Sequence, residues 1–207
     1  MHATDLLDRV IPGRRADLKR AILRQALHSF NLEGIDSTTI ESIRSECGAS
    51  VGAVYHHFKS KEGLVAALFY AALDDQESLR DEYLRNAVSV EGGIRALVYS
   101  YVDWVDGQPE WARFVLQARS SVATGPFRED LAARNKQRNK KLLVWMSNLG
   151  GEELLSHIPA ELLPSLIIGQ SESYSRAWLS KRVEKSPRDY RDHLGNAAWA
   201  SIKKPGV

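Results

Sequence analysis

Residues 38–58 read TTIESIRSECGASVGAVYHHF, and this stretch decides the fold. Thr38 and Glu41 stand three positions apart ahead of an apolar residue, and this capping-box pattern predicts that a short helix begins here. Gly48 follows, and glycine readily adopts the positive φ that a tight turn needs. The pattern therefore predicts a helix over 38–46 that ends at this glycine.

A second short helix is predicted over 50–56, directly after the glycine turn. Ser50 is a favourable N-cap residue. Val54 and Phe58 are four positions apart, so they lie on one face of that helix. Two short helices around a glycine turn are typical of a helix-turn-helix motif. A plain helical hairpin that binds nothing is the alternative.

The rest of the chain also has helical spacing, and no convincing alternation of apolar and polar residues favours a strand. The first three predicted helices are short and the later ones are longer, which indicates a small N-terminal module on a larger helical body. We expect an all-α protein of about nine helices, over 14–33, 38–46, 50–56, 60–86, 90–106, 109–118, 126–149, 159–183 and 187–203.

The composition is that of an ordinary globular protein. The chain has 207 residues, 43% of them hydrophobic and 26% charged, and its formal net charge is +2. Because this charge is small, nucleic-acid binding would depend on a local patch. A single cysteine, Cys47, excludes an intramolecular disulfide. Residues 1–13 lack a signal-peptide pattern, and no apolar run reaches the ~20 residues of a membrane helix, so we expect a cytoplasmic protein without a membrane partner.

Basic residues crowd the first predicted helix, with only Asp17 against them. Cations near a helix N-terminus oppose the helix dipole. A phosphate partner would explain them, and a solvated helix face is the equally open alternative. They are Arg14, Arg15, Lys19, Arg20 and Arg24.

The motif region resembles a known family. The runs GIDSTTIESI, CGAS, VGAVYHHF and KSKEGL are similar to the DNA-binding domain of TetR-type transcriptional regulators over about Arg20 to Leu68. The resemblance implies an N-terminal arm and helix-turn-helix DNA-binding domain over 1–62. A helical effector-binding and dimerisation domain would follow over 63–207. It also implies a homodimer that binds a double-stranded DNA operator and an unidentified small-molecule effector.

The resemblance further implies which residues contact DNA. Thr39 and Ser50 place hydroxyls and free N–H groups at helix N-termini, which suit phosphate. Lys61 lies in a first helical turn, where a cation is unfavourable unless a phosphate is near. His57 is open between a DNA contact and internal packing. The expected set is Thr39, Arg44, Ser50, Val51, Gly52, Ala53, Tyr55, His56 and Lys61.

Two features depart from the family pattern. Arg44 stands where the family commonly has a small residue, so we expect its side chain to lean outward to a phosphate or to an acid such as Glu46. Val51 and Ala53 stand where many members have polar side chains that reach base edges. Valine and alanine can contact a thymine methyl, and Gly52 lets the backbone approach closely, so we expect readout of methyl groups and DNA shape.

Residues 48–52, GASVG, also match the G-x-S-x-G nucleophile elbow of hydrolases, with Ser50 as the nucleophile. That elbow needs a preceding strand and a parallel sheet. A helix is predicted instead, so we expect no enzyme and no catalytic residue. His56 and His57 are adjacent on a helix and point ~100° apart, so they do not share a metal, and we expect neither metal nor cofactor.

Aromatic residues concentrate in the predicted central helices, which line the effector pocket in the family. We place the pocket at these residues, with ordinary core packing as the alternative for each. The run 134–141 holds five basic residues and no acid, which indicates a solvated face or a surface for an acidic ligand or DNA. The expected pocket residues are Tyr101, Trp104, Trp111, Phe114, Arg119 and Trp145.

The last two predicted helices are the expected dimer interface. Gly169, Ser173 and Ala177 are small residues four positions apart, which lets another helix come close. A four-helix contact between two copies is predicted, with an internal core as the alternative. The expected interface residues are Leu166, Gly169, Ser173, Ala177, Leu194 and Ala198.

These patterns together predict a sequence-specific transcriptional regulator, most simply a repressor that an effector releases from a pseudo-palindromic operator. Two alternatives stay open. One is a transcriptional activator of the same fold, and the other is a helical binding or scaffold protein without DNA binding.

Overall fold

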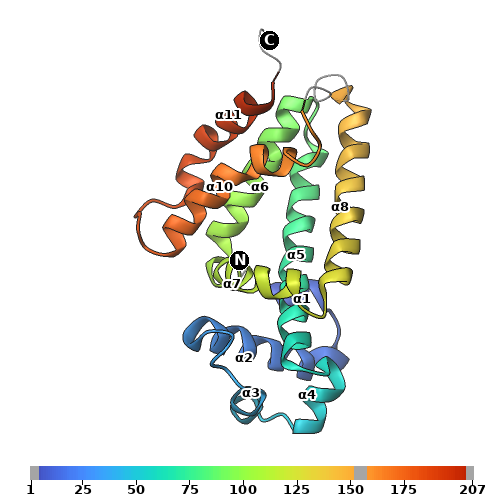
Figure 1. Cartoon of the computed structure of the whole chain (residues 1–207), viewed down its shortest axis with the longest axis vertical. Helices are drawn as coiled ribbons and strands as arrows, with labels where there is room; N and C mark the ends of the chain where they lie inside the picture. The colour runs from blue at the N-terminus through green and yellow to red at the C-terminus, as the bar shows by residue number, and fades with distance from the viewer. Residues whose placement is uncertain (1–4, 152–157, 204–207) are drawn as a thin grey trace. The chain divides into compact units, whose positions relative to one another are not determined.

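The computed structural model describes residues 5–151 and 158–203, and every regular element in those ranges is helical (Figure 1). The expected all-α fold is confirmed. The elements are α1 (Leu6–Val10), the 3-10 helix η1 (Arg14–Ala16), α2 (Asp17–Glu33), α3 (Ile40–Cys47), α4 (Val51–Phe58), α5 (Lys61–Arg85), α6 (Val90–Gly107), α7 (Pro109–Thr124), α8 (Arg128–Asn148), α10 (Leu163–Leu179), the 3-10 helix η2 (Pro187–Tyr190) and α11 (Arg191–Ile202).

The chain divides into two compact units, each with its own packing. The first takes the chain up to Asp75 together with Glu110–Ala133, and the second takes Gln76–Pro109 and the chain from Arg134 onward. Helix α5 therefore contributes residues to both units. The expected boundary at residue 62 falls inside the first unit, so the compact units and the expected functional domains divide the chain differently.

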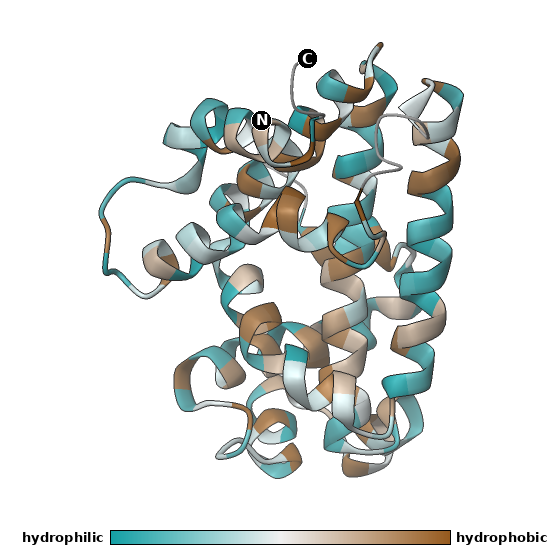
Figure 2. Ribbon diagram, turned by 45° about the horizontal axis from the view of Figure 1, so that its top comes forward, coloured by the Kyte–Doolittle hydropathy of each residue, from teal (hydrophilic) through white to brown (hydrophobic). Residues whose placement is uncertain are grey.

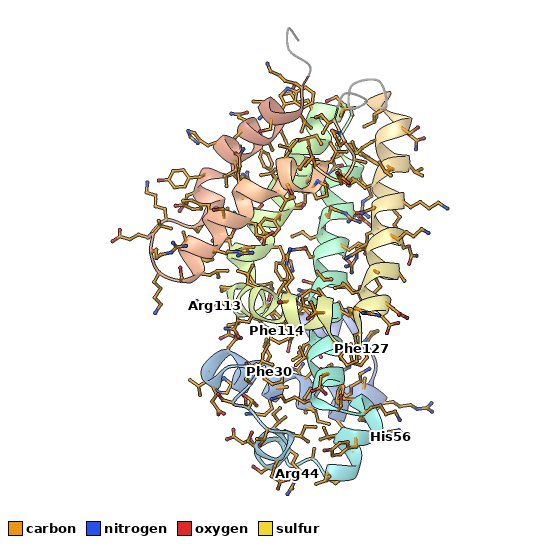
Figure 3. The ribbon with its side chains drawn as sticks, viewed as in Figure 1. Phe30, Arg44, His56, Arg113, Phe114 and Phe127 are labelled. Carbon is orange, nitrogen blue, oxygen red and sulfur yellow. The ribbon has the colours of Figure 1, made fainter. Side chains whose placement is uncertain are left out.

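The core of the first unit is built around α2. Its Ile22, Ala26 and Phe30 are fully buried because their i, i+4 spacing places them on one face. Leu18, one turn earlier in the same row, is 42% exposed. Phe30 stacks on Phe114 of α7, with ring centroids 5.9 Å apart (Figure 3).

Helix α1 is an element that the sequence patterns do not predict, because five residues are too few to show a helical period. Leu6 and Leu7 are nevertheless buried. Asp5 caps the helix by accepting a hydrogen bond from the Leu7 amide at 3.1 Å. The expected helix over 14–33 instead begins as η1 and continues as α2.

The second unit packs around α6, which contacts α10, η2 and α11. Its core joins residues of these helices with residues of α5 and α8. Helix α8, the long helix at the right of Figures 1 and 2, is mostly hydrophilic in colour and shows only scattered apolar residues. Buried members of the core include Ile94, Leu97, Val98, Val102, Met146, Ile167, Ala198 and Ile202.

Several helix ends differ from the expected ones. Helix α10 begins at Leu163 with Pro164 in its first turn, and the expected helix over 187–203 divides into η2 and α11. Gly93 lies near the start of α6. A Cβ there would overlap the Trp145 indole, so this glycine allows a close approach of α8.

Within the described ranges, no helix has both the length and the hydropathy required to cross a membrane.

Candidate DNA-binding surface

Helix α3 begins at Thr39 with a reciprocal cap. The Thr39 hydroxyl accepts a hydrogen bond from the Ser42 amide at 3.1 Å, and the Ser42 hydroxyl accepts one from the Thr39 amide at 3.3 Å. Thr38 is buried, and its hydroxyl donates to the Gly34 carbonyl at 2.8 Å. The expected Thr38–Glu41 capping box is therefore wrong by one position. Two adjacent threonines offer alternative caps, and serine closes the box in place of glutamate.

The turn and the second helix have the expected geometry. Gly48 has φ 67°, a left-handed conformation that a residue with a Cβ adopts only at a cost. The Ser50 hydroxyl accepts a hydrogen bond from the Ala53 amide at 3.1 Å and so caps α4. Val54 and Phe58 are buried and anchor that helix. Together α3, the turn and α4 form a helix-turn-helix.

This geometry also decides the competing reading of Ser50. The residue follows α3, and its hydroxyl is engaged in capping α4. A nucleophile elbow needs a strand ahead of the serine. The GASVG match is therefore the glycine turn of a helix-turn-helix.

The first turn of α4 is accessible, and Val51, Gly52 and Ala53 there carry no side-chain hydrogen-bond donor. Val51 and Tyr55 are 44% and 47% exposed. A Cβ added at Gly52 would have only the Ser50 hydroxyl within 4 Å, at 3.9 Å, so the backbone there is open. Ala53 is half-buried. The small apolar side chains of this first turn have the size and chemistry to enter a major groove and touch thymine methyls.

Arg44 leans outward, as expected, but its acidic partner differs from the expected one. Its Nε donates to Glu41 at 2.7 Å, one turn earlier on α3. Glu46 instead accepts a hydrogen bond from Gln25 at 2.9 Å. An exposed ion pair of this kind contributes little to stability, so a phosphate can exchange with Glu41 at low cost.

Lys61 lies in the first turn of α5 and ties the loop before α3 to α5. Its ammonium donates to the Asp36 and Thr38 carbonyls, both at 3.0 Å. Two of the three ammonium donors are thereby used. One donor is left for a phosphate.

The two histidines of α4 both lie on the surface. His57 is exposed, which rules out the internal packing that was its alternative. Its ring meets that of His56 edge-on, with centroids 5.3 Å apart. Partial desolvation, followed by the charges of His56 and Lys19, lowers the pKa of His57. Figure 3 shows His56 and Arg44 on the surface of the motif.

Comparison with known proteins gives the family. Residues 22–68 match the model of the bacterial regulatory proteins of the tetR family. The chain is 30% identical over 158 residues to the HTH-type transcriptional repressor KstR2 of Mycobacterium tuberculosis, and the match covers 71% of this chain and 72% of that protein. The chain belongs to the TetR family.

Other similarities agree with this TetR-family assignment. The crystal structure of a TetR family transcription regulator from Marinobacter aquaeolei shares the fold, with a TM-score of 0.76, 22% identity, and coverage of 93% of this chain and 99% of that one. The HTH-type transcriptional regulator YerO of Bacillus subtilis is 49% identical over 47 residues, 23% of this chain and 16% of that protein. That last match thus spans less than two thirds of the relative.

The expected effector residues of this TetR-family chain lie in both compact units. Trp111 and Phe114 belong to the first, where both are buried and Phe114 stacks on Phe30. Arg119, also in the first unit, is exposed.

The other three expected effector residues belong to the second unit. Trp104 is buried, and Tyr101 and Trp145 are half-buried against the core. Trp145 also lines a groove of about 410 Å³ together with Arg80, Leu84, Arg85, Lys141 and Leu142.

The expected dimer residues also differ in exposure. Ala198 is 1% exposed and packs in the core of its own chain. Its side chain is therefore not on the surface, where the expected interface would need it. Leu166 and Leu194 are half-buried and pack against the same core. Gly169, Ser173 and Ala177 stay accessible to different degrees, and a Cβ on Gly169 would meet nothing within 4 Å. The small-residue row of α10 therefore has open space beside it at Gly169.

Proposed function

We propose that this TetR-family chain is a sequence-specific DNA-binding transcriptional repressor that acts as a homodimer and is released by a small-molecule effector. The exposed face of α4 carries the proposal. That face is held by the Ser50 cap and by buried Val54 and Phe58, and it presents Val51 and Tyr55 to solvent. A preorganised helix with a narrow free face loses little freedom when it enters a major groove.

The proposed contacts divide into two kinds. Val51, Gly52 and Ala53 would touch base edges and shape the fit. Thr39, Arg44, Ser50, Tyr55, His56 and Lys61 would contact the phosphate backbone. Backbone contacts fix the register of the protein on DNA, whereas base contacts carry sequence information.

The effector is proposed to act through the helical body. Helix α5 holds Lys61 at its start and lines the groove beside Trp145 near its end. A ligand in that groove would bias the position of this helix and thereby lower operator affinity. By thermodynamic reciprocity, bound operator must weaken ligand binding by the same factor.

A band shift with genomic fragments tests the proposal. If the protein is a repressor, we expect a sequence-selective protein–DNA complex whose affinity falls as the salt concentration rises. A protein that forms no such complex would be a helical scaffold instead. Transcription measured from a promoter that carries the bound fragment separates a repressor, which lowers transcript yield, from an activator, which raises it.

A further inference from the structure

The five basic residues around the start of α2 fall into two groups in the structure. Arg20 and Arg24 are held by carboxylates of the same chain. Arg14, Arg15 and Lys19 make no ion pair with any residue in the described ranges 5–151 and 158–203. This separation is the basis of the inference that follows.

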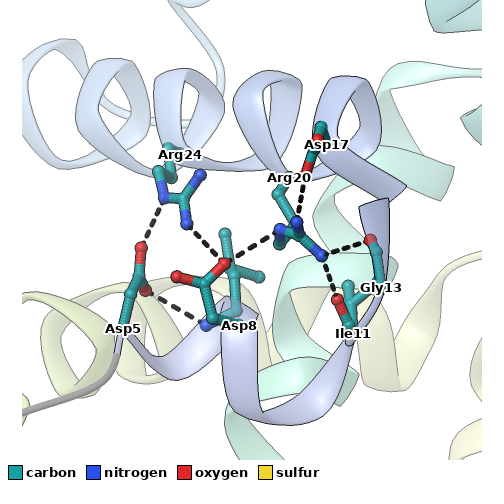
Figure 4. A network of polar contacts seen from close by, with 8 residues as sticks. Asp5, Asp8, Ile11, Gly13, Asp17, Arg20 and Arg24 are labelled. Carbon is teal, nitrogen blue, oxygen red and sulfur yellow. Dashed lines mark hydrogen bonds and ion pairs between the residues drawn. The ribbon is translucent and has the colours of Figure 1, made fainter. Parts of the chain in front are cut away.

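Arg20 and Arg24 are neutralised within the first unit (Figure 4). Arg20 pairs with Asp8 at 2.9 Å and with Asp17, and its side chain is only 10% exposed. Arg24 pairs with Asp8 at 2.9 Å and with Asp5. Helix α1 and its N-cap residue thus bring two of the three carboxylates that satisfy these two guanidinium groups.

Arg20 also fixes the turn between α1 and η1. Its guanidinium donates to the carbonyls of Ile11 at 2.6 Å and of Gly13 at 3.0 Å. Gly13 has φ 97°, which favours glycine. Because a buried arginine holds this turn, the η1 residues that follow it, Arg14 and Arg15, are presented in a defined place.

The three unpaired cations lie near a helix N-terminus, where the helix dipole disfavours positive charge. Arg14 and Arg15 are exposed at the N-terminal end of the helix, where the dipole repels positive charge. Lys19 lies one turn after Arg15 and is close enough to the α4 imidazole of His57 to act on its charge. Arg14, Arg15 and Lys19 belong to the same compact unit as α4, and Lys19 acts on the charge of a residue in the last turn of that helix.

We propose that Arg14, Arg15 and Lys19 form a second phosphate-binding surface, which grips the DNA backbone flanking the groove that α4 enters. This proposal rests on the proposed DNA-binding function. It adds residues that lie outside the segment matched by the family model, Ile22–Leu68. DNA phosphates are the fitting ligand because they offset three like charges and the helix dipole together.

Salt dependence of operator binding tests this surface. The full-length Arg14→Ala/Arg15→Ala variant is titrated with a fluorescent operator duplex between 50 and 200 mM salt, alongside the wild-type protein. Two lost phosphate contacts should lower the slope of log affinity against log salt by about two units for each protomer bound. Affinity should fall for every duplex by a similar factor, so the preference among sequences stays unchanged.

Two control variants isolate the cause. Lys136→Ala/Lys140→Ala removes the same net charge from exposed positions of α8 in the second unit and should leave the slope near the wild-type value. Arg14→Lys/Arg15→Lys keeps the charges and should also keep the slope. If the alanine pair unfolds, Lys19→Ala carries the test alone, with a slope about one unit smaller.

The outcomes separate this surface from the function on which it rests. A wild-type protein that binds operator, with an Arg14→Ala/Arg15→Ala slope equal to its own, would overturn the surface and leave the repressor proposal standing. An equal loss of slope in the α8 control would show a general charge effect and also overturn it. A wild-type protein that forms no salt-dependent complex would overturn both proposals.

Discussion

At the scale of single residues, the proposed recognition surface depends on the donors that the first turn of α4 lacks. Val51 is exposed, and neither it nor Ala53 has a side-chain hydrogen-bond donor. Such residues discriminate bases only by touching a methyl group or by excluding a bulkier partner. Arg44 of α3 carries guanidinium donors, and in this structure it pairs with Glu41.

Uracil substitution in the operator tests methyl readout. Replacing a contacted thymine by uracil removes only the C5-methyl, so we expect a loss of about 1 kcal/mol per contacted thymine, at the low end of base discrimination. Val51→Ala should remove most of that sensitivity in a fluorescence titration. Unchanged affinity with uracil, together with lost selectivity in Arg44→Ala, would instead identify Arg44 as the specificity residue.

The structure shows one role of Lys61, and a second is proposed. Lys61→Ala should lower the salt slope of operator binding by about one unit per half-site, since one fewer counterion is released. It should also destabilise the fold by about 1–2 kcal/mol, because the Asp36 and Thr38 carbonyls lose their donor. Urea denaturation measures the second effect. A stability loss with an unchanged slope would show that Lys61 only pins the loop.

At the scale of helices, one carboxylate joins α5 to α8. Glu77 accepts from Arg138 at 2.7 Å and from Lys141 at 2.9 Å, and Arg80 lies 3.4 Å away. Burial alone would raise the pKa of Glu77, but these cations outweigh it and lower the pKa. The basic run 134–141 is therefore partly engaged inside the chain rather than wholly solvated.

Glu77→Gln should destabilise the protein in a pH-dependent way. A lowered folded-state pKa means that the carboxylate contributes stability above its unfolded pKa and loses it as pH falls through the folded one. We expect a cost of about 1–2 kcal/mol at neutral pH, which disappears in acid. Urea denaturation at both pH values measures it. Glu82→Gln, an exposed acid on the same helix, is the control, and an equal cost there would contradict the role of Glu77.

At the scale of the whole molecule, the proposed homodimer is expected to pack through α10. Gly169 has open space beside it, so a leucine there meets nothing in its own chain. We expect Gly169→Leu to weaken dimerisation by roughly 1–3 kcal/mol per contact, applied twice by two-fold symmetry. Sedimentation at micromolar concentration measures it. Gly107→Leu, at an equally open glycine of α6, should leave the dimer intact, and an intact Gly169→Leu dimer would place the interface elsewhere.

Local patterns in the sequence were sufficient for the fold class and the recognition motif. Caps, a glycine turn and i, i+4 apolar spacing act within a few residues, so they are readable without the fold. Even there, the choice between Thr38 and Thr39 as the cap depended on the burial of Thr38.

Only the tertiary structure decided which of the basic residues near α2 form ion pairs and which of the aromatic residues pack together. Arg24 meets Asp5, 19 positions away, and α1 is too short to have a visible period. Trp111 and Trp104 fall in different compact units, and Ala198 turns into its own core. These outcomes depend on contacts between distant segments, and such contacts form only when the helices pack. The sequence alone determined the all-helical class, the longer helices and the motif, whereas packing determined which side chains remain available to bind.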